Sequence, residues 1–252
     1  MIILGSRARL AFFGALVASL AAAGTAGAQQ QGDGFLFGAP HGTFTVRAGY
    51  AAAAAKGSLV DFTTTNLTLN RSDFSSPAVS AELGLWLQSR TLLQLSLGYA
   101  GMNRPSEFRQ YVDSANQAIT QTTQFQRVPL SVSVKEYLTS PGRSIGSFAW
   151  VPSRIAPYVG AGVGTMWSRF KQSGDFVDFQ TDSIFNSVLQ SSAWSPMAQA
   201  MAGVDYSISP RFALNAEATY QWANAQLSND FAGFGRMDLS GLSTTVGLSV
   251  RF

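Results

Sequence analysis

Six charged residues lie at alternating positions within segments that otherwise alternate between apolar and small polar side chains. They are three bases and three acids: Arg47, Glu82, Lys135, Asp205, Glu217 and Arg251. A period of two residues places alternate side chains on opposite faces of a strand, and all six share the face rich in Gly, Ala, Ser, Thr and Gln. Opposite charges held away from water are expected to form ion pairs, because an unpaired buried charge is costly.

The positions of these charges predict two groups. Arg47 lies at a similar depth in its strand as Glu82 and Glu217 in theirs, so we expect the guanidinium to bind between the two carboxylates. The other three charges lie nearer one end of their strands: Lys135, Asp205 and Arg251. The strand between Lys135 and Asp205 carries only glycine on that face, which predicts that these two side chains approach each other across it: Gly160, Gly162 and Gly164.

Other reactive side chains are scarce. The chain has no cysteine, so it can form neither a disulfide framework nor a Cys-ligated zinc or iron–sulfur site. The single histidine, His41, has no Ser or acid beside it in the sequence, and we expect an exposed residue rather than part of a hydrolytic triad. The glycines of 160–164 lack the spacing of a dinucleotide-binding loop. We therefore expect no catalytic residue, no metal and no cofactor.

The composition narrows the class of protein. Of 252 residues, 46% are hydrophobic and 12% are charged, whereas about 25% charged residues are usual. The hydrophobic content argues against a disordered chain. Two of the 17 basic residues are Arg7 and Arg9, which leaves 15 bases against 14 acids in the rest. This balance gives no basic surface for nucleic acid, and none is expected as a partner.

The N-terminus has the order of an export signal. Basic residues precede the apolar run 10–24, and the small residues of 25–28 follow it. This order predicts a signal peptide over residues 1–28, with cleavage after Ala28. The apolar run is shorter than the ~20 residues of a spanning helix, although a membrane-anchoring helix is the alternative. Residues 29–40 would then form a short periplasmic N-terminal segment before one domain over 41–252.

Eight segments of that domain have a two-residue period and are predicted to be strands: 43–50, 79–87, 93–100, 128–135, 159–164, 198–206, 212–221 and 242–252. Short alternating stretches in 57–69 and 174–181 could either bring the number of strands to ten or merely lengthen hairpins. One residue from each segment illustrates the apolar face: Phe44, Leu83, Leu95, Val132, Val163, Val204, Leu214 and Leu248.

The connections between these segments alternate in length. Joins near 88–91 and 207–210 are tight and that at 139–154 is longer, whereas four long polar segments lie between: 52–76, 103–124, 168–194 and 225–238. Outer-membrane barrels place short turns in the periplasm and long loops outside the cell. A soluble sandwich, the alternative, would carry many charges on its polar face, which has few here. The sequence predicts an all-β, closed antiparallel up-and-down transmembrane barrel of eight strands.

The long segments contain two apolar patterns with helical spacing. One lies in 106–119, after Ser106 as a potential N-cap: Phe108, Tyr111, Val112, Ala115 and Ile119. The other lies in 183–189. Each predicts a short helix that packs on the barrel mouth, or alternatively presents a surface to a hydrophobic ligand or a host partner.

Two segments carry a resemblance to known proteins. Residues Ala156–Gly164 resemble the Pro-Tyr-x-Gly-x-Gly-x-Gly strand of small outer-membrane β-barrel families, and Gly241–Phe252 is similar to their closing strand. The likeness is closest to the OmpA/OmpX type and the porin-like grouping. It implies residence in a Gram-negative outer membrane, with Phe252 read by the barrel-assembly machinery. No active-site residue is carried over.

The pattern and the resemblance together predict an integral outer-membrane protein with a membrane-structural or surface-interaction role. Its lumen would be plugged by the polar and charged side chains, because eight-stranded barrels are just wide enough for side chains to fill them. One alternative is a narrow channel or conduit for small, hydrophobic molecules, and a further one is a barrel-embedded hydrolase. Expected partners are outer-membrane lipid, the assembly machinery, and an extracellular ligand or host surface.

Overall fold

The computed structural model describes residues 34–252, except residues 114, 147 and 182. The predicted signal peptide over 1–28, and residues 29–33 of the segment that follows, lie outside the described residues. Those boundaries therefore stay predictions. None of the helices in the described part of the chain is both long and apolar enough to cross a membrane.

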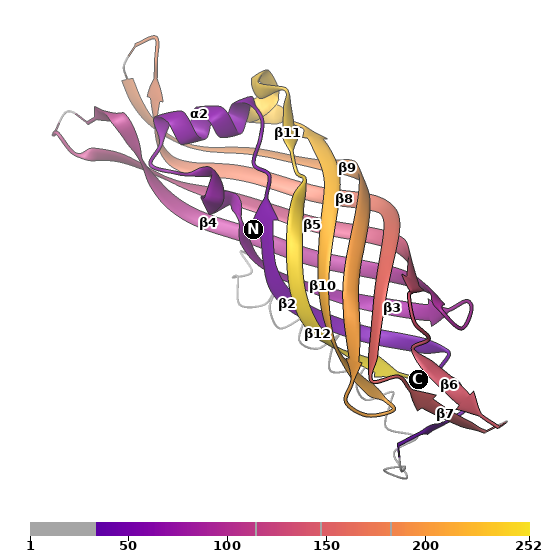
Figure 1. The fold of residues 1–252 in the computed structure, drawn as a ribbon. Helices are drawn as coiled ribbons and strands as arrows, with labels where there is room; N and C mark the ends of the chain where they lie inside the picture. The colour runs from indigo at the N-terminus through magenta and orange to yellow at the C-terminus, as the bar shows by residue number, and fades with distance from the viewer. Residues whose placement is uncertain (1–33, 114, 147, 182) are drawn as a thin grey trace, which may run out of the picture. The chain divides into compact units, whose positions relative to one another are not determined.

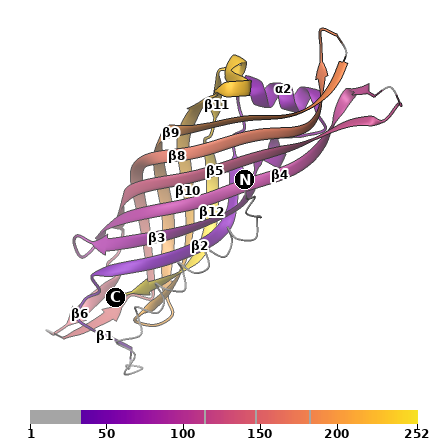
Figure 2. The same cartoon turned by 180° about the vertical axis from the view of Figure 1, so that it is seen from behind.

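Eight antiparallel strands of the described chain form a closed ring (Figures 1 and 2): β2 (Gly42–Ala53), β3 (Ser76–Trp86), β4 (Thr91–Val112), β5 (Ala118–Tyr137), β8 (Ile155–Asp178), β9 (Ser183–Ser207), β10 (Phe212–Gln226) and β12 (Gly241–Arg251). Each strand pairs with the next, and β12 closes the ring on β2, with Val250 opposite Phe44. The predicted eight-stranded up-and-down barrel is confirmed, and the ten-stranded alternative is wrong.

The outer surface of the ring is apolar and the inner surface is polar. Side chains such as Leu95 and Val163 lie outside and are 49% and 68% exposed. The residues that alternate with such side chains along the strands point inward and are buried, as Gln94 and Ser133 are. Burial is thus inverted relative to a water-soluble protein, as required of a barrel whose outer wall contacts lipid.

Four strands are much longer than a membrane requires. A transmembrane strand needs about 9–11 residues, whereas β8 and β9 have 24 and 25 and β4 and β5 have 22 and 20. The excess residues extend beyond the barrel on the side of the long loops, as two hairpins joined to each other through β5 and β8 (Figure 1). We call this extension of β4, β5, β8 and β9 the upper sheet.

The helices predicted within 106–119 and 183–189 are wrong. Glu107 lies opposite Thr120 in the β4–β5 hairpin, and Ser183 is the first residue of β9, paired with β8. The β8–β9 ladder runs through 183–189 without a break, whereas the β4–β5 ladder shifts its register between Glu107 and Val112. In both segments strand pairing takes backbone groups that a helix would have used. Cross-strand pairing thus outweighs a local spacing that was also compatible with a helix.

The helical turns of the described loops lie elsewhere. Between β2 and β3 the chain forms α2 (Ser58–Asn66) and a 3₁₀ turn, η2 (Arg71–Phe74). Between β10 and β12 it forms a second 3₁₀ turn, η3 (Asn229–Phe234), and the short strand β11 (Arg236–Asp238). α2 begins directly after Gly57, whose φ of 125° favours glycine.

These loops also cover the two open edges of the upper sheet. β3 pairs with β4 only as far as Ala100. Beyond it the Thr68 N–H donates to the Glu107 carbonyl, and the Thr68 hydroxyl accepts from the Glu107 N–H, at 2.9 Å each. On the far edge β10 accompanies β9 only to Met197, and beyond that the Gln190 N–H donates to Asp230 at 2.9 Å. Loop groups therefore occupy part of each edge.

The opposite, periplasmic end has the short turns. β3–β4 and β9–β10 are joined by residues 87–90 and 208–211, and a hairpin of β6 (Gly142–Ile145) and β7 (Ala149–Pro152) joins β5 to β8. β1 (Leu36–Phe37) pairs with β7, outside the ring. The short turns lie at the predicted end, and long loops join β2 to β3 and β10 to β12 at the extracellular end. The predicted long connections 103–124 and 168–194 are instead mostly strand, in the extended β4–β5 and β8–β9 hairpins.

One place in the wall departs from the regular ladder. Between the pairs Leu97–Leu130 and Ala100–Arg127 of β4 and β5, the intervening residues are not paired, although the register is kept. Pro129 lies in this interval and has no N–H to donate. The absent Cβ of Gly98 leaves room for the proline ring, since a Cβ there would lie 3.0 Å from Pro129 Cγ.

The lipid-facing surface yields a first prediction. Replacing Leu95 by Arg places a charge on the outer wall, and we expect it to lower the free energy of unfolding in lipid vesicles by about 2–4 kcal/mol. The matched control is Val112→Arg, at a residue of the upper sheet that is 56% exposed, which should change it by less than about 0.5 kcal/mol. Equal effects of the two substitutions, measured by denaturant titration, would contradict a lipid-facing position for Leu95.

Candidate functional site

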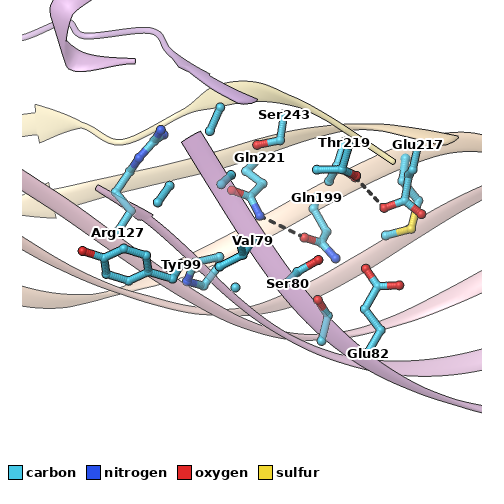
Figure 3. A pocket seen from close by; sticks show the side chains of 18 of the residues that line it. Val79, Ser80, Glu82, Tyr99, Arg127, Gln199, Glu217, Thr219, Gln221 and Ser243 are labelled. Carbon is cyan, nitrogen blue, oxygen red and sulfur yellow. Dashed lines mark hydrogen bonds between the residues drawn. The ribbon is translucent and has the colours of Figure 1, made fainter. Parts of the chain in front are cut away.

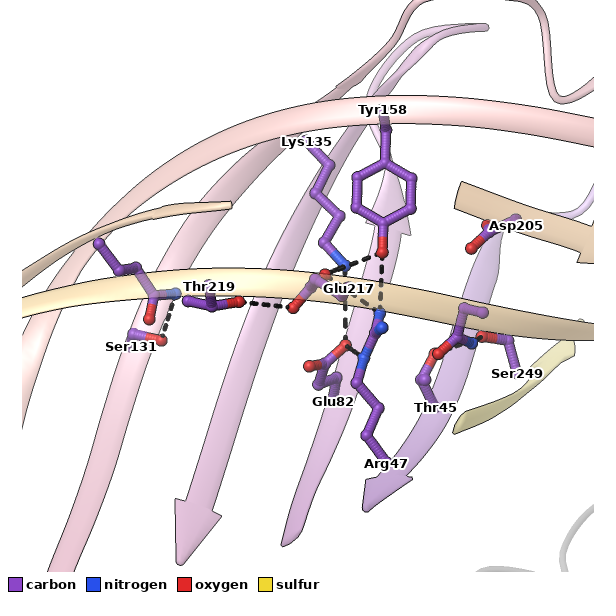
Figure 4. A network of polar contacts seen from close by, with 12 residues as sticks. Thr45, Arg47, Glu82, Ser131, Lys135, Tyr158, Asp205, Glu217, Thr219 and Ser249 are labelled. Carbon is purple, nitrogen blue, oxygen red and sulfur yellow. Dashed lines mark hydrogen bonds and ion pairs between the residues drawn. The ribbon is translucent and has the colours of Figure 1, made fainter. Parts of the chain in front are cut away.

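Four charged side chains meet inside the barrel (Figure 4). Arg47 Nε lies 3.0 Å from Glu82 Oε2, and Arg47 Nη2 lies 3.2 Å from Glu217 Oε2. Lys135 Nζ lies 2.7 Å from the same Glu217 oxygen and 3.7 Å from Glu82 Oε2. All four are at most 8% exposed. Two bases and two acids thus form one neutral group, which we call the charged plug.

A tyrosine completes the charged plug. Tyr158 OH donates to Glu217 Oε2 at 2.9 Å and accepts from Arg47 Nη2 at 3.3 Å. The Lys135 ammonium lies 4.5 Å from the centroid of the Tyr158 ring, in cation–π geometry. The five side chains come from β2, β3, β5, β8 and β10, which lie around the ring, so their contacts cross the lumen.

The predicted contact between Lys135 and Asp205 is wrong. Lys135 turns to Glu217, and the Tyr158 ring lies between Lys135 and Asp205 (Figure 4). The Asp205 carboxylate instead accepts from Tyr137 OH at 2.8 Å. Gly160 faces Lys135 across the β5–β8 ladder, and a Cβ there would lie 3.1 Å from Met201 Cγ. The Tyr158 ring lies against Gly203 instead, where a Cβ would lie 2.6 Å from Tyr158 Cζ.

The sixth predicted charge, Arg251, does not join the charged plug. Its guanidinium donates to Ser207 Oγ at 2.9 Å and to the Pro210 carbonyl at 3.4 Å, and lies over the Trp150 ring. It therefore ties the end of β12 to the β9–β10 turn and to the β7 segment at the periplasmic end.

Tyr137 and Tyr158 are functional-site residues that the sequence analysis missed. Strand alternation could have found them, because Tyr158 shares its face with Gly160, and Tyr137 shares its face with Lys135. Both are buried, and their rings are 5.3 Å apart between centroids. Their role is to supply hydroxyl groups to the lumen charges while filling the space that glycines leave.

Neutral hydrogen bonds surround the charged plug. Thr45, Asn215 and Ser249 are linked, with both contacts to Ser249 Oγ at 2.7 Å. On the other side of the charged plug, Gln199 donates to Ser131 Oγ at 3.0 Å and accepts from Gln221 at 3.3 Å. These links also join inward-facing side chains of different strands.

The extracellular end of the lumen is closed differently, by an apolar cluster that we call the apolar cap. Leu59 and Val60 of α2 and Phe74 of η2 pack there with Met166 and Phe170 of the wall, all at most 2% exposed. Residues from the other loop join them: Leu227, Phe231, Met237 and Leu239. The loop segments are thus folded over the barrel mouth and share a core with its wall.

A cavity of about 70 Å³ lies between these two levels (Figure 3). Glu82 and Glu217 of the charged plug line it, as does Arg127, whose Cζ lies 5.5 Å from the centroid of the Phe125 ring in the apolar cap. The rest of the lining is half apolar, with Val79, Tyr99 and Met201 among its residues, and half polar: Ser80, Gln94, Ser96, Gln199, Thr219, Gln221, Ser243 and Thr245. Among the described residues, no three His, Asp or Glu side chains gather as a metal site.

His41 and Phe252 lie together at the periplasmic rim. The N–H groups of His41 and Gly42 donate to the Phe252 carbonyl at 2.8 and 2.9 Å. The side chains of His41 and Phe252 are exposed. No hydrogen bond joins the His41 side chain to another described residue. The last residue is therefore held by backbone contacts with the start of the first strand of the ring.

These observations define the class of the protein. The closed ring, the apolar outer wall and the packed polar interior make it an integral outer-membrane β-barrel protein of the small, eight-stranded kind. No protein-family model matches the chain, and no curated protein matches its sequence.

Solved structures resemble it in fold. Neisserial surface protein A, NspA, is 14% identical, with 87% of this chain and 98% of that one covered and a TM-score of 0.48. The outer membrane protein OprG from Pseudomonas aeruginosa is 14% identical over 86% and 99%, with a TM-score of 0.46. Ail, the attachment invasion locus protein of Yersinia pestis, is 12% identical over 84% and 99%, with a TM-score of 0.43.

The charged plug yields a second prediction. Glu217→Gln leaves Arg47 and Lys135 with the single carboxylate of Glu82, so we expect unfolding to become easier by about 3–5 kcal/mol. The control is Asp61→Asn, which removes the partner of Arg71 from an exposed ion pair and should cost at most about 1 kcal/mol. Denaturant titration of the refolded barrels measures both.

A double variant distinguishes the effect of an unbalanced charge on stability from the effect of a changed side-chain shape. Adding Lys135→Met to Glu217→Gln restores neutrality, so the double variant should lose less stability than the sum of the two single variants. Additive losses would show that these side chains do not act as one neutral group.

Proposed function

We propose that this protein is a non-conducting outer-membrane barrel whose function lies in its extracellular surface and in its contribution to the membrane. The observation that carries this proposal is the closure of the lumen at two levels, by the charged plug and by the apolar cap. A conducting pore needs a continuous aqueous path, and in the described lumen the charged plug and the apolar cap lie on either side of a cavity of about 70 Å³.

The two levels differ in kind. The charged plug is held by charge-assisted hydrogen bonds between opposite walls, which are stronger than neutral ones. The apolar cap consists of loop residues with a shared core, so it cannot admit water without exposing buried side chains such as Phe74 and Met166. Opening one level would leave the other in place.

The extracellular segments are held in place by apolar packing and hydrogen bonds, which suits recognition of a ligand or a host surface. A second apolar cluster joins the α2 loop to the upper sheet: Leu67, Leu69, Phe108, Ile119 and Val177. The Asp178 carboxylate at a hairpin tip accepts the Gln180 N–H at 2.9 Å, which holds the pKa of that exposed carboxyl below its usual value. Apolar side chains are nevertheless exposed on the β8–β9 hairpin, among them Phe179 at 50% and Val188 at 56%.

The conduit for small hydrophobic molecules is the second candidate. It is favoured by the cavity and by the interrupted ladder beside it, since Gly98, Tyr99 and Pro129 are among the lining residues. The three charged side chains of the lining, Glu82, Arg127 and Glu217, disfavour it. A hydrolytic role is disfavoured by the position of His41, which is exposed at the periplasmic rim.

Assembly is a separate part of the proposal. We propose that Phe252 is the residue read by the barrel-assembly machinery, because it ends the closing strand and its ring is 57% exposed. The same residue then closes the ring through its backbone contacts with His41 and Gly42.

A third prediction tests the closure. Wild-type protein in planar lipid bilayers should give no steady single-channel steps. Two single-level variants should also stay closed: Arg47→Ser with Glu82→Ser, which leaves the ion pair of Lys135 and Glu217, and a short Gly-Ser linker in place of residues 58–74. Only the combination of both changes should conduct.

Insertion is checked in the same samples by heat-modifiable gel migration, which distinguishes the folded barrel from the unfolded chain. Steady steps from the wild type that disappear when residues 58–74 are replaced would overturn the proposal in favour of transport.

A further inference from the structure

Arg127 differs from Arg47 and Lys135, the two bases of the charged plug. It points inward from β5 and is 4% exposed, yet it forms no ion pair with a described carboxylate. Its Nη1 donates to the Leu239 carbonyl at 3.2 Å, whereas its Nη2 is buried without a hydrogen-bond partner. A buried cation with an unused donor is costly unless an anion or water compensates it.

The carboxylates of the lumen are not available to compensate it. Glu82 and Glu217 are both within ion-pair distance of Arg47 and Lys135, and those four charges cancel. The carboxylate next to Leu239, on Asp238, accepts the Ser240 N–H at 2.8 Å. The third buried carboxylate of the lumen, Asp205, accepts from Tyr137, and its charge is offset by that of the likewise buried Arg251. Arg127 therefore leaves one unbalanced positive charge inside the barrel, away from the charged plug.

The cavity beside Arg127 has room for a compensating ion. Its volume of about 70 Å³ compares with the roughly 10–15 Å³ that one water molecule needs on the same measure. Five Ser, Thr and Gln side chains of the lining make no hydrogen bond to another described residue: Ser80, Gln94, Ser96, Ser243 and Thr245. Hydroxyl and amide groups of this kind can donate to an anion or to its remaining waters.

We propose that this cavity is a binding site for a small, singly charged anion, of the size of a halide or a short carboxylate, held by Arg127. The anion makes the lumen neutral and fills the space between the charged plug and the apolar cap. Because the two carboxylates of the charged plug line the cavity as well, the anion lies at the end near Arg127, where Figure 3 shows the guanidinium apart from Glu82 and Glu217.

Bromide is a suitable probe, because it scatters X-rays anomalously and is of halide size. The full chain is unfolded and refolded into detergent with sodium bromide, so that ion entry does not depend on opening the apolar cap. Crystals grown in this salt should give an anomalous peak in the cavity within hydrogen-bond distance of the Arg127 guanidinium. An empty or water-filled cavity without that peak would overturn the proposal.

Stability gives the second readout. At constant ionic strength with gluconate as the exchanging salt, each tenfold rise in bromide above the dissociation constant should lower the unfolding equilibrium constant about tenfold. Arg127→Gln should abolish this dependence and Arg127→Lys should retain it. Arg143→Gln, at an exposed arginine of β6, is the matched control and should behave as the wild type. An equal bromide response in wild type and Arg127→Gln would show that the anion acts elsewhere.

Discussion

The requirement that every backbone polar group within lipid finds a partner in the protein determines the rest of this structure. Strands can meet it only by closing into a ring, and here β12 pairs with β2 to leave no free edge within the barrel. Closure with eight strands leaves an interior about as wide as the side chains that fill it. The inward side chains must then satisfy one another, and this is why Arg47, Glu82, Lys135 and Glu217 meet as a neutral group. The unpaired ladder positions beside Pro129 are the exception in that wall.

Much of this barrel can be predicted from the sequence, because the side chains of a strand alternate between lipid and lumen with a period of two residues. Alternation assigns Leu95 to the lipid and Gln94 to the lumen, and the cost of buried charge predicts that Arg47 needs carboxylates. The carboxylate with which a buried base pairs does not follow from this alternation. Lys135 could reach either Glu217 or Asp205 by strand position, and the bulk of Tyr158 decides between them. Local patterns also fail where tertiary pairing is stronger, as in the helix expected around Phe108.

The lumen is closed by the charged plug and by the apolar cap, and only the charged plug could be predicted from the sequence. Charges within alternating strands stand out, whereas the apolar cap is assembled from loop residues such as Leu59, Phe74 and Met237 that lack a common spacing. Apolar inward residues of the upper wall, such as Met166 and Phe170, interrupt an otherwise polar face and carry the signal for it. Between the two closures lies Arg127, a base of the same strand as Lys135 but without a carboxylate.

The loops of the upper sheet have one more consequence. Above the barrel, β4 and β9 are edge strands, and an uncovered edge is a template on which another chain can add a strand. Between neighbouring copies in an outer membrane, two such open edges could pair with each other as β strands. Thr68 and Asp230 occupy backbone positions on the two edges, so the loop segments that cover the barrel mouth also block part of each edge to strand addition by a neighbouring copy.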